Sequence, residues 1–575
     1  MEAFGTEHKN QIVSALTSAG YRPKLVKFKG TYSECRHQTR QDTGGNVMQP
    51  EEHTVTHTIN RYRSFRYELI LEGVVVGALA GAVVVAFRYL IGSADILLNM
   101  ILDYGKSHTW FVPVWILILA VAACVVSLLL KWDSLISGSG IPQIEGEIIG
   151  EIDEKWWRVL LAKLGGGIIS LGCGLSLGRE GPSIQLGAMT AKGFSRAAKR
   201  VKTEEKLLIT CGASAGLSAA FNAPIAGILF SLEEVHKHFS PELLLSSMAA
   251  SITSDFVSRN VFGLTPVFSF HITHMMPLGT YGHVLVLGVL MGAMGVVYNT
   301  TLSKTQDLYG KIPWGTSKLL LPFLLAGVFG FTYRSVLGGG HALVEELSTG
   351  EMALGALCLL LVVKFTFSMI SFGSGAPGGI FLPLLVMGAI IGSIYYNAAL
   401  LVSPSLSGLV GNFIILGMAG YFSAIVRAPI TGIILISEMT GSFSHLLTLS
   451  MVSLAAYLVP DMVHCAPVYD QLLHRLLAKQ NPDKKVTLTG EKVLVEGMIY
   501  HGSAAEGKKV SAIAWPRTSL VVSLMRGEAE FVPRGDTVLR AGDKIVVLCD
   551  ETSQGQLHKA LQEYCETVAP MQKGQ

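Results

Sequence analysis

Long apolar stretches recur along most of this 575-residue chain and dominate what it can fold into. Half of the residues are hydrophobic, only 15% are charged and the mean hydropathy is +0.46, which does not fit a soluble protein of this size. A helix of about 20 apolar residues crosses the roughly 30 Å of bilayer hydrocarbon. Stretches of that length include residues 69–87, 111–130 and 353–370. From Glu68 to about Val459 the chain is therefore predicted to be an all-α polytopic membrane protein.

The leader before these stretches, residues 1–65, is polar and carries several Lys and Arg, so it does not resemble a signal peptide. The excess of Lys and Arg favours a cytoplasmic N-terminal segment. We expect both termini to be cytoplasmic and the protein to lie in the cell membrane. The net charge of +3 comes without a basic stripe, so no nucleic-acid partner is expected.

The eight cysteines form no CxxC pair and several lie in apolar stretches. This pattern favours reduced thiols that pack in the interior, and a metal or redox role is the weaker alternative. We expect no metal ion, no cofactor and no enzymatic activity.

The apolar region contains a duplication. Residues 160–174 (LLAKLGGGIISLGCG) match residues 361–375 (LVVKFTFSMISFGSG), with Lys163 and Lys364 at the same offset. In the same order, residues 212–234 match residues 417–439 in an Ala-Pro-Ile triplet, a glycine and a glutamate, which is Glu233 in the first copy and Glu438 in the second. Similar composition alone would not align charges and prolines. Two repeats are predicted, at about 66–270 and 279–465, as is typical of transporters.

Three glycine-rich segments interrupt the apolar pattern. They read GSGIPQIEG (138–146), GREGP (178–182) and GSGAPGGIFLP (373–383). Each combines small residues with a proline suited to the first turn of a helix, so each is predicted to be a chain break followed by a helix start. The free N–H groups at such starts favour an anion. A kinked, glycine-packed helix would explain any one segment, but all three together predict helix starts that converge on one anion, which the Glu180 carboxylate can mimic.

With Tyr469 in APVYDQLL, these segments resemble the signature motifs of the CLC chloride channels and chloride/proton antiporters. The resemblance covers about Arg63 to Leu476 and implies two repeats of inverted topology, built from tilted and broken helices, and a homodimer with one pathway per subunit. The motif positions are Gly138, Gly140, Pro142, Gly178, Arg179, Gly181, Pro182, Gly378 and Gly379.

The resemblance also implies roles for individual residues. Chloride would be bound by the hydroxyls of Ser139 and Tyr469 and by the backbone amides of Ile380 and Phe381. Glu180 would be the external gate and proton acceptor. The presence of Ser139 and Arg179 favours chloride over fluoride or nitrate.

A second acid separates the two kinds of transport within the family. Glu234 stands at the position of the internal proton-transfer glutamate of the antiporters, although paired glutamates can also simply mark a helix end in water. We therefore expect exchange of chloride for protons, with a passive voltage- or proton-gated channel as the alternative and a sensor that no longer transports as a lesser one. Lys163 and Lys364 could either attract anions or extend to the membrane interface.

The chain changes character after Tyr469. A charged linker is expected at 474–490, a small α+β domain at 491–566 and a tail at 567–575, beyond a transmembrane domain of residues 66–473. Short β-branched runs at Leu520–Leu524 and Lys544–Leu548 predict strands. The stretch VPRGDTVLRAGDKIVVL resembles the TrkA-C (RCK-C) regulatory domain. This domain is expected to sense a small-molecule or nucleotide ligand, or else to act as a passive dimer clamp.

Overall fold

The computed structural model of the protein describes residues 55–480 and 492–566. Within these ranges it leaves out residues 238, 265, 269–274, 313–317, 517–518, 528, 551–556 and 558–559. The expected cytoplasmic segment 1–65, up to residue 54, and the expected tail 567–575 lie outside the described residues.

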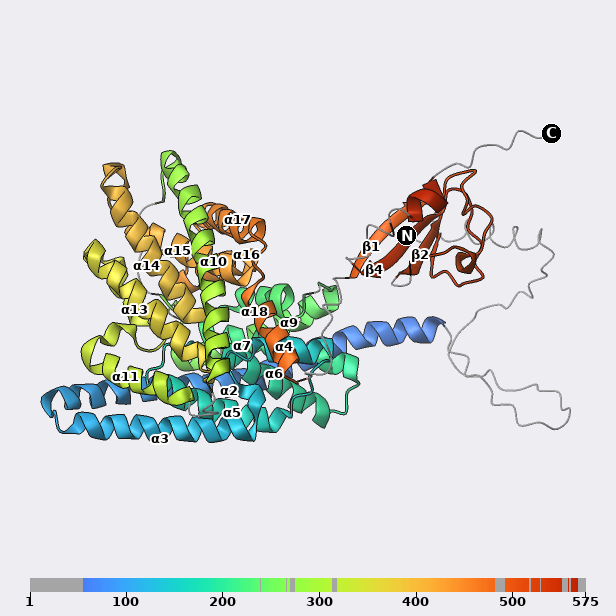
Figure 1. Ribbon diagram of the computed structural model, residues 1–575. Helices are drawn as coiled ribbons and strands as arrows, with labels where there is room; N and C mark the ends of the chain where they lie inside the picture. The colour runs from blue at the N-terminus through green and yellow to red at the C-terminus, as the bar shows by residue number, and fades with distance from the viewer. Residues whose placement is uncertain are drawn as a thin grey trace, which may run out of the picture. The chain divides into compact units, whose positions relative to one another are not determined.

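The membrane part is built from two series of helices that follow the same order (Figure 1). The first series consists of α2 (Val55–Ser107), α3 (Phe111–Trp132), α4 (Ile141–Ile149), α5 (Trp156–Gly172), α6 (Glu180–Ala197), α7 (Lys202–Phe221), α8 (Pro224–Phe230) and α9 (Pro241–Phe262). The second consists of α10 (Tyr281–Lys311), α11 (Leu320–Thr332), α12 (His341–Ser348), α13 (Leu354–Gly373), α14 (Phe381–Leu400), α15 (Val410–Val426), α16 (Pro429–Thr440) and α17 (Leu446–Met462). The predicted duplication is therefore confirmed helix by helix.

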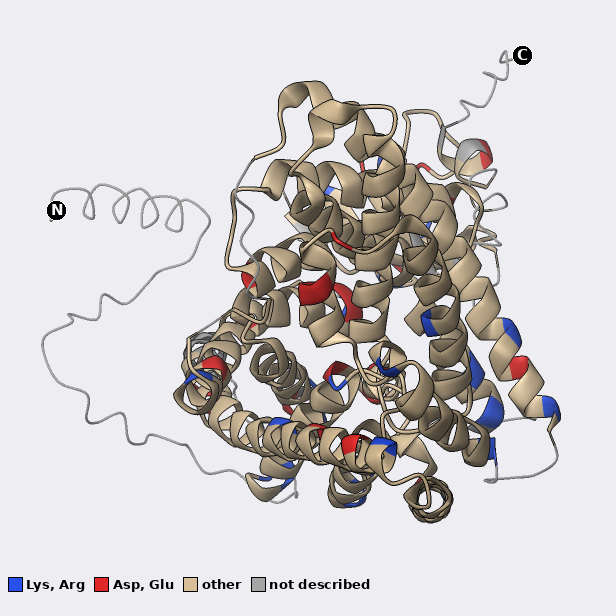
Figure 2. Cartoon of the chain, turned by 90° about the vertical axis from the view of Figure 1, so that its left-hand side faces the viewer, with Lys and Arg blue, Asp and Glu red and all other residues tan. Residues whose placement is uncertain are grey.

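The apolar stretches all lie on helices, as expected. Five helices among the described residues are long and apolar enough to cross a membrane, and several shorter apolar helices lie beside them. Figure 2 shows that charged residues are sparse along these helices. The chain is an integral membrane protein.

Close glycine contacts pack the most deeply buried helices in both series. In the first, α6 lies against α7, where Gly187 and Gly212 leave no room for a Cβ atom between the two backbones. In the second, α14 lies against α15 with Gly388 and Gly417 in the same relation. Small residues of this kind let membrane helices approach without large side chains between them.

The chain continues into α18 (Val468–Gln480), which extends the helical region into the stretch where we expected the linker to begin. A separate four-stranded antiparallel sheet follows, in the order β1-β4-β2-β3. Its strands are β1 (Lys492–Met498), β2 (Leu520–Arg526), β3 (Ala529–Phe531) and β4 (Lys544–Asp550), so both predicted strands are confirmed. Leu524, Ile545 and Val547 are buried in a core shared with Leu561 near the last helical turn.

Candidate functional site

Backbone hydrogen bonds hold the three glycine-rich loops together. Gly178 and Gly379 exchange two hydrogen bonds, each 2.7 Å between N and O, so the loops before α6 and α14 are paired like a minimal antiparallel sheet. The Gly378 amide donates to the Gly138 carbonyl at 3.0 Å, which adds the loop before α4. Loops that are 40 to 240 residues apart in the chain thus meet at one place, as the sequence predicted.

Each of these loops ends in a helix start with free backbone N–H groups. The helices α4, α6 and α14 begin at Ile141, Glu180 and Phe381, and none of the three has a side chain that caps its N-terminus. At the start of α4, Gly140 adopts a left-handed backbone with φ of 98°. Uncapped helix starts present partial positive charge, so the junction of the loops is suited to an anion.

The hydroxyls of Ser139 and Tyr469 lie at this junction. Both residues are buried, and neither hydroxyl has a hydrogen-bond partner among the residues that the structure describes. Ser139 is reached closely by the start of α6, since a Cβ atom at Gly181 would collide with its side chain. Two buried hydroxyl donors without partners are unusual and indicate a place for a bound acceptor.

Glu180 is completely buried at the first residue of α6. Its carboxylate lies next to the backbone amide of Leu382, in the first turn of α14, and against Gly178, where no side chain would fit. Neither carboxylate oxygen forms a hydrogen bond of normal distance and angle with the described residues. The Tyr469 phenol lies close to the Ser139 hydroxyl and within electrostatic reach of Glu180 and Glu234.

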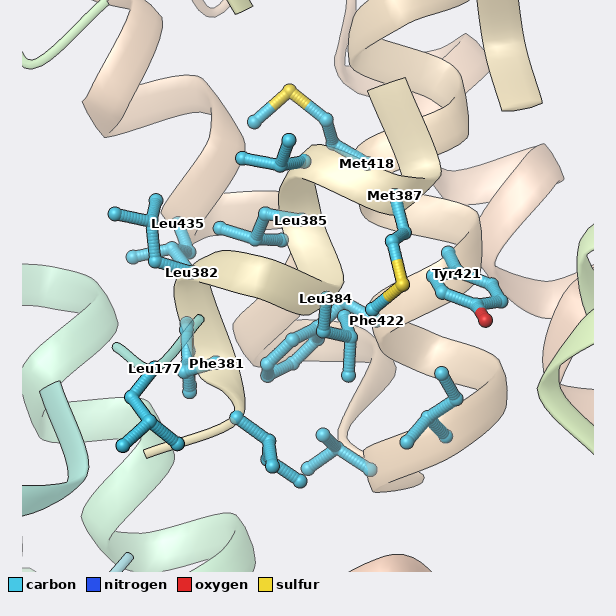
Figure 3. Close-up of a cluster of buried hydrophobic side chains, with 14 of the residues drawn as sticks. Leu177, Phe381, Leu382, Leu384, Leu385, Met387, Met418, Tyr421, Phe422 and Leu435 are labelled. Atoms are coloured by element: carbon cyan, nitrogen blue, oxygen red, sulfur yellow. The ribbon is translucent and has the colours of Figure 1, made fainter. Parts of the chain in front are cut away.

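Aromatic rings line the interior around the start of α14 (Figure 3). The Phe381 ring lies 4.7 Å from the Phe422 ring and 5.8 Å from the Phe230 ring, measured between centroids. The Phe230 ring in turn lies 6.4 Å from the Tyr469 ring. This aromatic column was not predicted, because its members are far apart in the sequence and look like ordinary core residues.

Glu234 lies at the end of the α8 helix, in the π-helical turn η2 (Ser231–Val235). It is 5% exposed, and its Oε1 atom has no hydrogen-bond partner among the described residues. It is therefore no ordinary helix end in water. Its neighbour Glu233 points elsewhere and accepts hydrogen bonds from the amide (2.9 Å) and the hydroxyl (2.7 Å) of Thr431.

Glu233 has a counterpart in the other repeat. Glu438 accepts hydrogen bonds from the amides of Ile225 and Ala226 at 3.1 and 2.8 Å. Each glutamate thus caps a helix of the opposite repeat, Glu233 the start of α16 and Glu438 the start of α8. These two acids link the repeats.

The structure contradicts the expectation that Lys163 and Lys364 extend to the membrane interface. Both side chains are fully buried, so they do not extend to the membrane interface. The Lys163 ammonium donates to the carbonyls of Ile136 (2.9 Å) and Gly138 (2.7 Å), in the loop before α4. In the second repeat, the Lys364 ammonium donates to Val336 (2.9 Å) and Gly338 (2.8 Å), in the loop before α12. Both lysines shape a loop.

A cavity of about 410 Å³ reaches Ser139 past α10 and α18. Its walls include the cations Lys318, Lys479 and Arg475. Arg475 is paired with Asp307 at 2.6 Å. The two lysines give the cavity lining a net positive charge, which favours anions. This cavity was not predicted from the sequence, because its walls come from distant segments.

The remaining motif positions shape the three loops. Gly138 has a left-handed φ of 65°, Pro142 lies in the first turn of α4, and Arg179 and Pro182 flank the start of α6.

The family model described as voltage gated chloride channel matches residues 122–461, most of the membrane part. The chain belongs to the CLC family.

Known CLC proteins resemble the chain over 428 residues. A protein named H(+)/Cl(-) exchange transporter ClcA from Vibrio cholerae is 36% identical over 72% of this chain and 91% of its own length. The namesake from Salmonella arizonae is 35% identical over 72% and 90%. These two matches leave about a quarter of this chain uncovered.

Solved structures confirm the CLC fold with its two inverted repeats. The crystal structure of a slow cyanobacterial Cl⁻/H⁺ antiporter superposes with a TM-score of 0.69, at 30% identity over 72% of this chain and 99% of that chain. A eukaryotic CLC transporter superposes at 0.61 with 20% identity, over 72% and 75%, and supports the fold alone. Beyond the membrane part of this CLC protein, residues 494–562 match the TrkA-C domain, as the sequence predicted.

Proposed function

We propose that this CLC protein is a secondary active transporter that exchanges chloride for protons across the membrane. The observation that carries the proposal is the Glu180 carboxylate, which is buried beside the uncapped start of α14, where an anion is favoured. A carboxylate inside a membrane protein is costly and usually functional. The ClcA relatives and the cyanobacterial antiporter are named as exchangers of the same two ions.

Chloride is bound by neutral donors in this proposal. These are the hydroxyls of Ser139 and Tyr469 and the backbone amides of Ile380 and Phe381, at the start of α14. Neutral donors bind the ion strongly enough to admit it and weakly enough to release it. The positive cavity beside Ser139 supplies a route for chloride from one side of the membrane.

Two acids carry the proton. When Glu180 is ionised, its carboxylate occupies the anion path beside the Leu382 amide; when protonated, it loses its attraction to that helix start and leaves the path to chloride. Glu234 passes protons between Glu180 and the cytosol. Because Glu233 is engaged with Thr431, it is not available for this role.

Measurement of both ions in proteoliposomes tests the proposal. A chloride gradient should drive protons uphill, in a fixed ratio to the chloride that moves. Chloride flux without proton movement would instead identify a passive channel of the same fold, and absence of both fluxes in a folded, reconstituted protein would favour a sensor.

We further propose a homodimer in the cell membrane, with one pathway per subunit, both termini in the cytosol and no enzymatic activity. We call the face that includes Glu234 and α18 the inner face. The proposed division is a transmembrane domain of residues 66–473, a linker, and a regulatory domain of residues 491–566.

The TrkA-C domain regulates exchange in response to a cytosolic small molecule or nucleotide, since the family of this domain is regulatory and its core is separate from that of the membrane part. A protein that ends near Lys484 should still exchange chloride for protons, because Tyr469 is the last residue of the site. A ligand that stabilises the domain should alter flux in the full-length protein only. If truncation weakens the dimer and no ligand acts, the domain is a clamp.

A further inference from the structure

Four ionisable side chains meet on the inner side of the chloride site. The Lys237 ammonium contacts the buried carboxylate of Glu145 on α4 and lies 2.5 Å from Asp470 Oδ1 on α18. The Glu234 carboxylate lies within electrostatic reach of all three. One cation therefore faces three acids from three different elements.

The two contacted acids stand directly behind the two chloride ligands. The helix of Glu145 begins two residues after Ser139, and Asp470 follows Tyr469 in the chain. Lys237 thus joins the element that carries one hydroxyl to the element that carries the other. Without this cation, the carboxylates of α4 and α18 would repel each other across the inner mouth of the site.

The backbone aims Lys237 at this position. Two residues after the π-helical turn that holds Glu234, Lys237 adopts a left-handed conformation with φ of 55°, which is unfavourable for a residue with a Cβ atom. Single turns of π-helix and left-handed residues of this kind are often found at functional sites.

We propose that Lys237 is a positioning residue that ties α18 to α4 and thereby holds Tyr469 against Ser139 on the inner side of the chloride site. The inference rests on the proposed exchange function. While the tie is intact, chloride does not slip past the two hydroxyls on its own, so its movement stays linked to that of protons. When the tie is lost, chloride moves without its share of protons.

The first test measures transport of both ions by Lys237→Met in proteoliposomes. Relative to the wild type, we expect the number of protons moved per chloride to fall at least about twofold, while chloride flux per protein is kept or rises. Lys237→Arg retains the positive charge and should restore the wild-type ratio. Lys199→Met is the matched control, because Lys199 has the same left-handed backbone (φ of 53°), is exposed and makes no ion pair with any described residue.

Three outcomes of this test contradict the inference or its basis. If the wild type couples the ions and Lys237→Met couples them in the same ratio, the inference is wrong. If Lys237→Met loses both fluxes in proportion, Lys237 only supports the fold. If the wild type itself moves chloride without protons, the proposed exchange fails, and the tie must be judged by a measurement that does not depend on coupling.

Hydrogen–deuterium exchange provides that measurement. In Lys237→Met, the backbone amides of α18 should exchange about threefold faster or more than in the wild type, and those of Lys199→Met should not change. Asp470→Asn, which leaves the Glu145 contact intact, should have a smaller effect in the same direction. Unchanged exchange in α18 of Lys237→Met would overturn the tie whatever the transport assay gives.

Discussion

The two repeats share more features of backbone conformation and hydrogen bonding than the sequence match alone shows. Gly140 before α4 and Gly340 before α12 both adopt left-handed φ angles, of 98° and 86°. The preceding loops are each held by a buried lysine, Lys163 or Lys364, and each repeat caps a helix of the other through a glutamate. The duplication therefore preserved the scaffold.

The side chains of the proposed transport chemistry, by contrast, lie in the first repeat, apart from Tyr469 on α18, which follows the second repeat. Their counterparts in the second repeat, judged by the equivalent helix starts and the matched segments, are Gly339 for Ser139, Phe381 for Glu180 and Met439 for Glu234. The second repeat contributes backbone amides and aromatic surface. The difference teaches that two similar backbone repeats position a site whose side chains are not repeated. Substitution of a site residue should therefore change transport, whereas substitution of a residue that holds the backbone should change stability.

The largest effect on coupling is expected from Glu180→Gln. Glutamine is a neutral near-isostere of the protonated acid and cannot release a proton, so proton transport should fall to the background while chloride flux persists. Flux of both ions in proteoliposomes is the measurement. Glu346→Gln, an exposed acid on α12 of the second repeat, is the control and should couple normally. Uphill proton movement by Glu180→Gln would remove Glu180 from the gate.

Glu234→Gln should keep chloride movement and lose most proton movement, because only the inner relay is removed. The neighbouring Glu233→Gln is the comparison, because Glu233 caps the start of α16 through Thr431 and takes no part in the proposed proton transfer. Glu233→Gln should lower the free energy of unfolding by about 1 kcal/mol and leave the number of protons moved per chloride unchanged. Coupling that fails in Glu233→Gln and survives in Glu234→Gln would reverse the two assignments.

Because Lys163 and Lys364 hold equivalent loops in the two repeats, we expect similar losses of stability from Lys163→Met and Lys364→Met. Each change leaves at least two buried or part-buried carbonyls without their donor, at about 1–3 kcal/mol for each. Thermal unfolding in detergent should therefore show a large downward shift of similar size for both variants. A strong effect of one lysine and none of the other would mean that the frames are not equivalent.

The smallest effect is expected from Ser139→Pro, which removes a hydroxyl donor from the chloride site. The preference for chloride over nitrate should relax a few-fold, about 1 kcal/mol, in anion competition assays. Ser139→Thr retains a hydroxyl and should keep more of the preference. An unchanged selectivity ratio in Ser139→Pro would exclude the Ser139 hydroxyl from the ion site.

Sequence patterns predicted the parts of this protein that are encoded locally. Apolar length predicted the helices, and glycine with proline predicted the starts of α4, α6 and α14. The partners of buried polar groups could not be predicted in the same way. The carbonyls bound by Lys163, the cap made by Glu438 and the contact of Lys237 with Asp470 each join residues that only the folded chain brings together.

The central claim is that anion binding belongs to the junction of the three loops, between Ser139 of the first repeat and Tyr469 of α18, with no equivalent site in the second repeat. A crystal structure with bromide in place of chloride tests this directly, because bromide is located by its anomalous scattering. We predict a bromide peak within hydrogen-bond distance of both Ser139 Oγ and Tyr469 OH, and none at the counterpart position beside Gly339. An empty Ser139–Tyr469 site, or an equal peak at Gly339, would contradict the account.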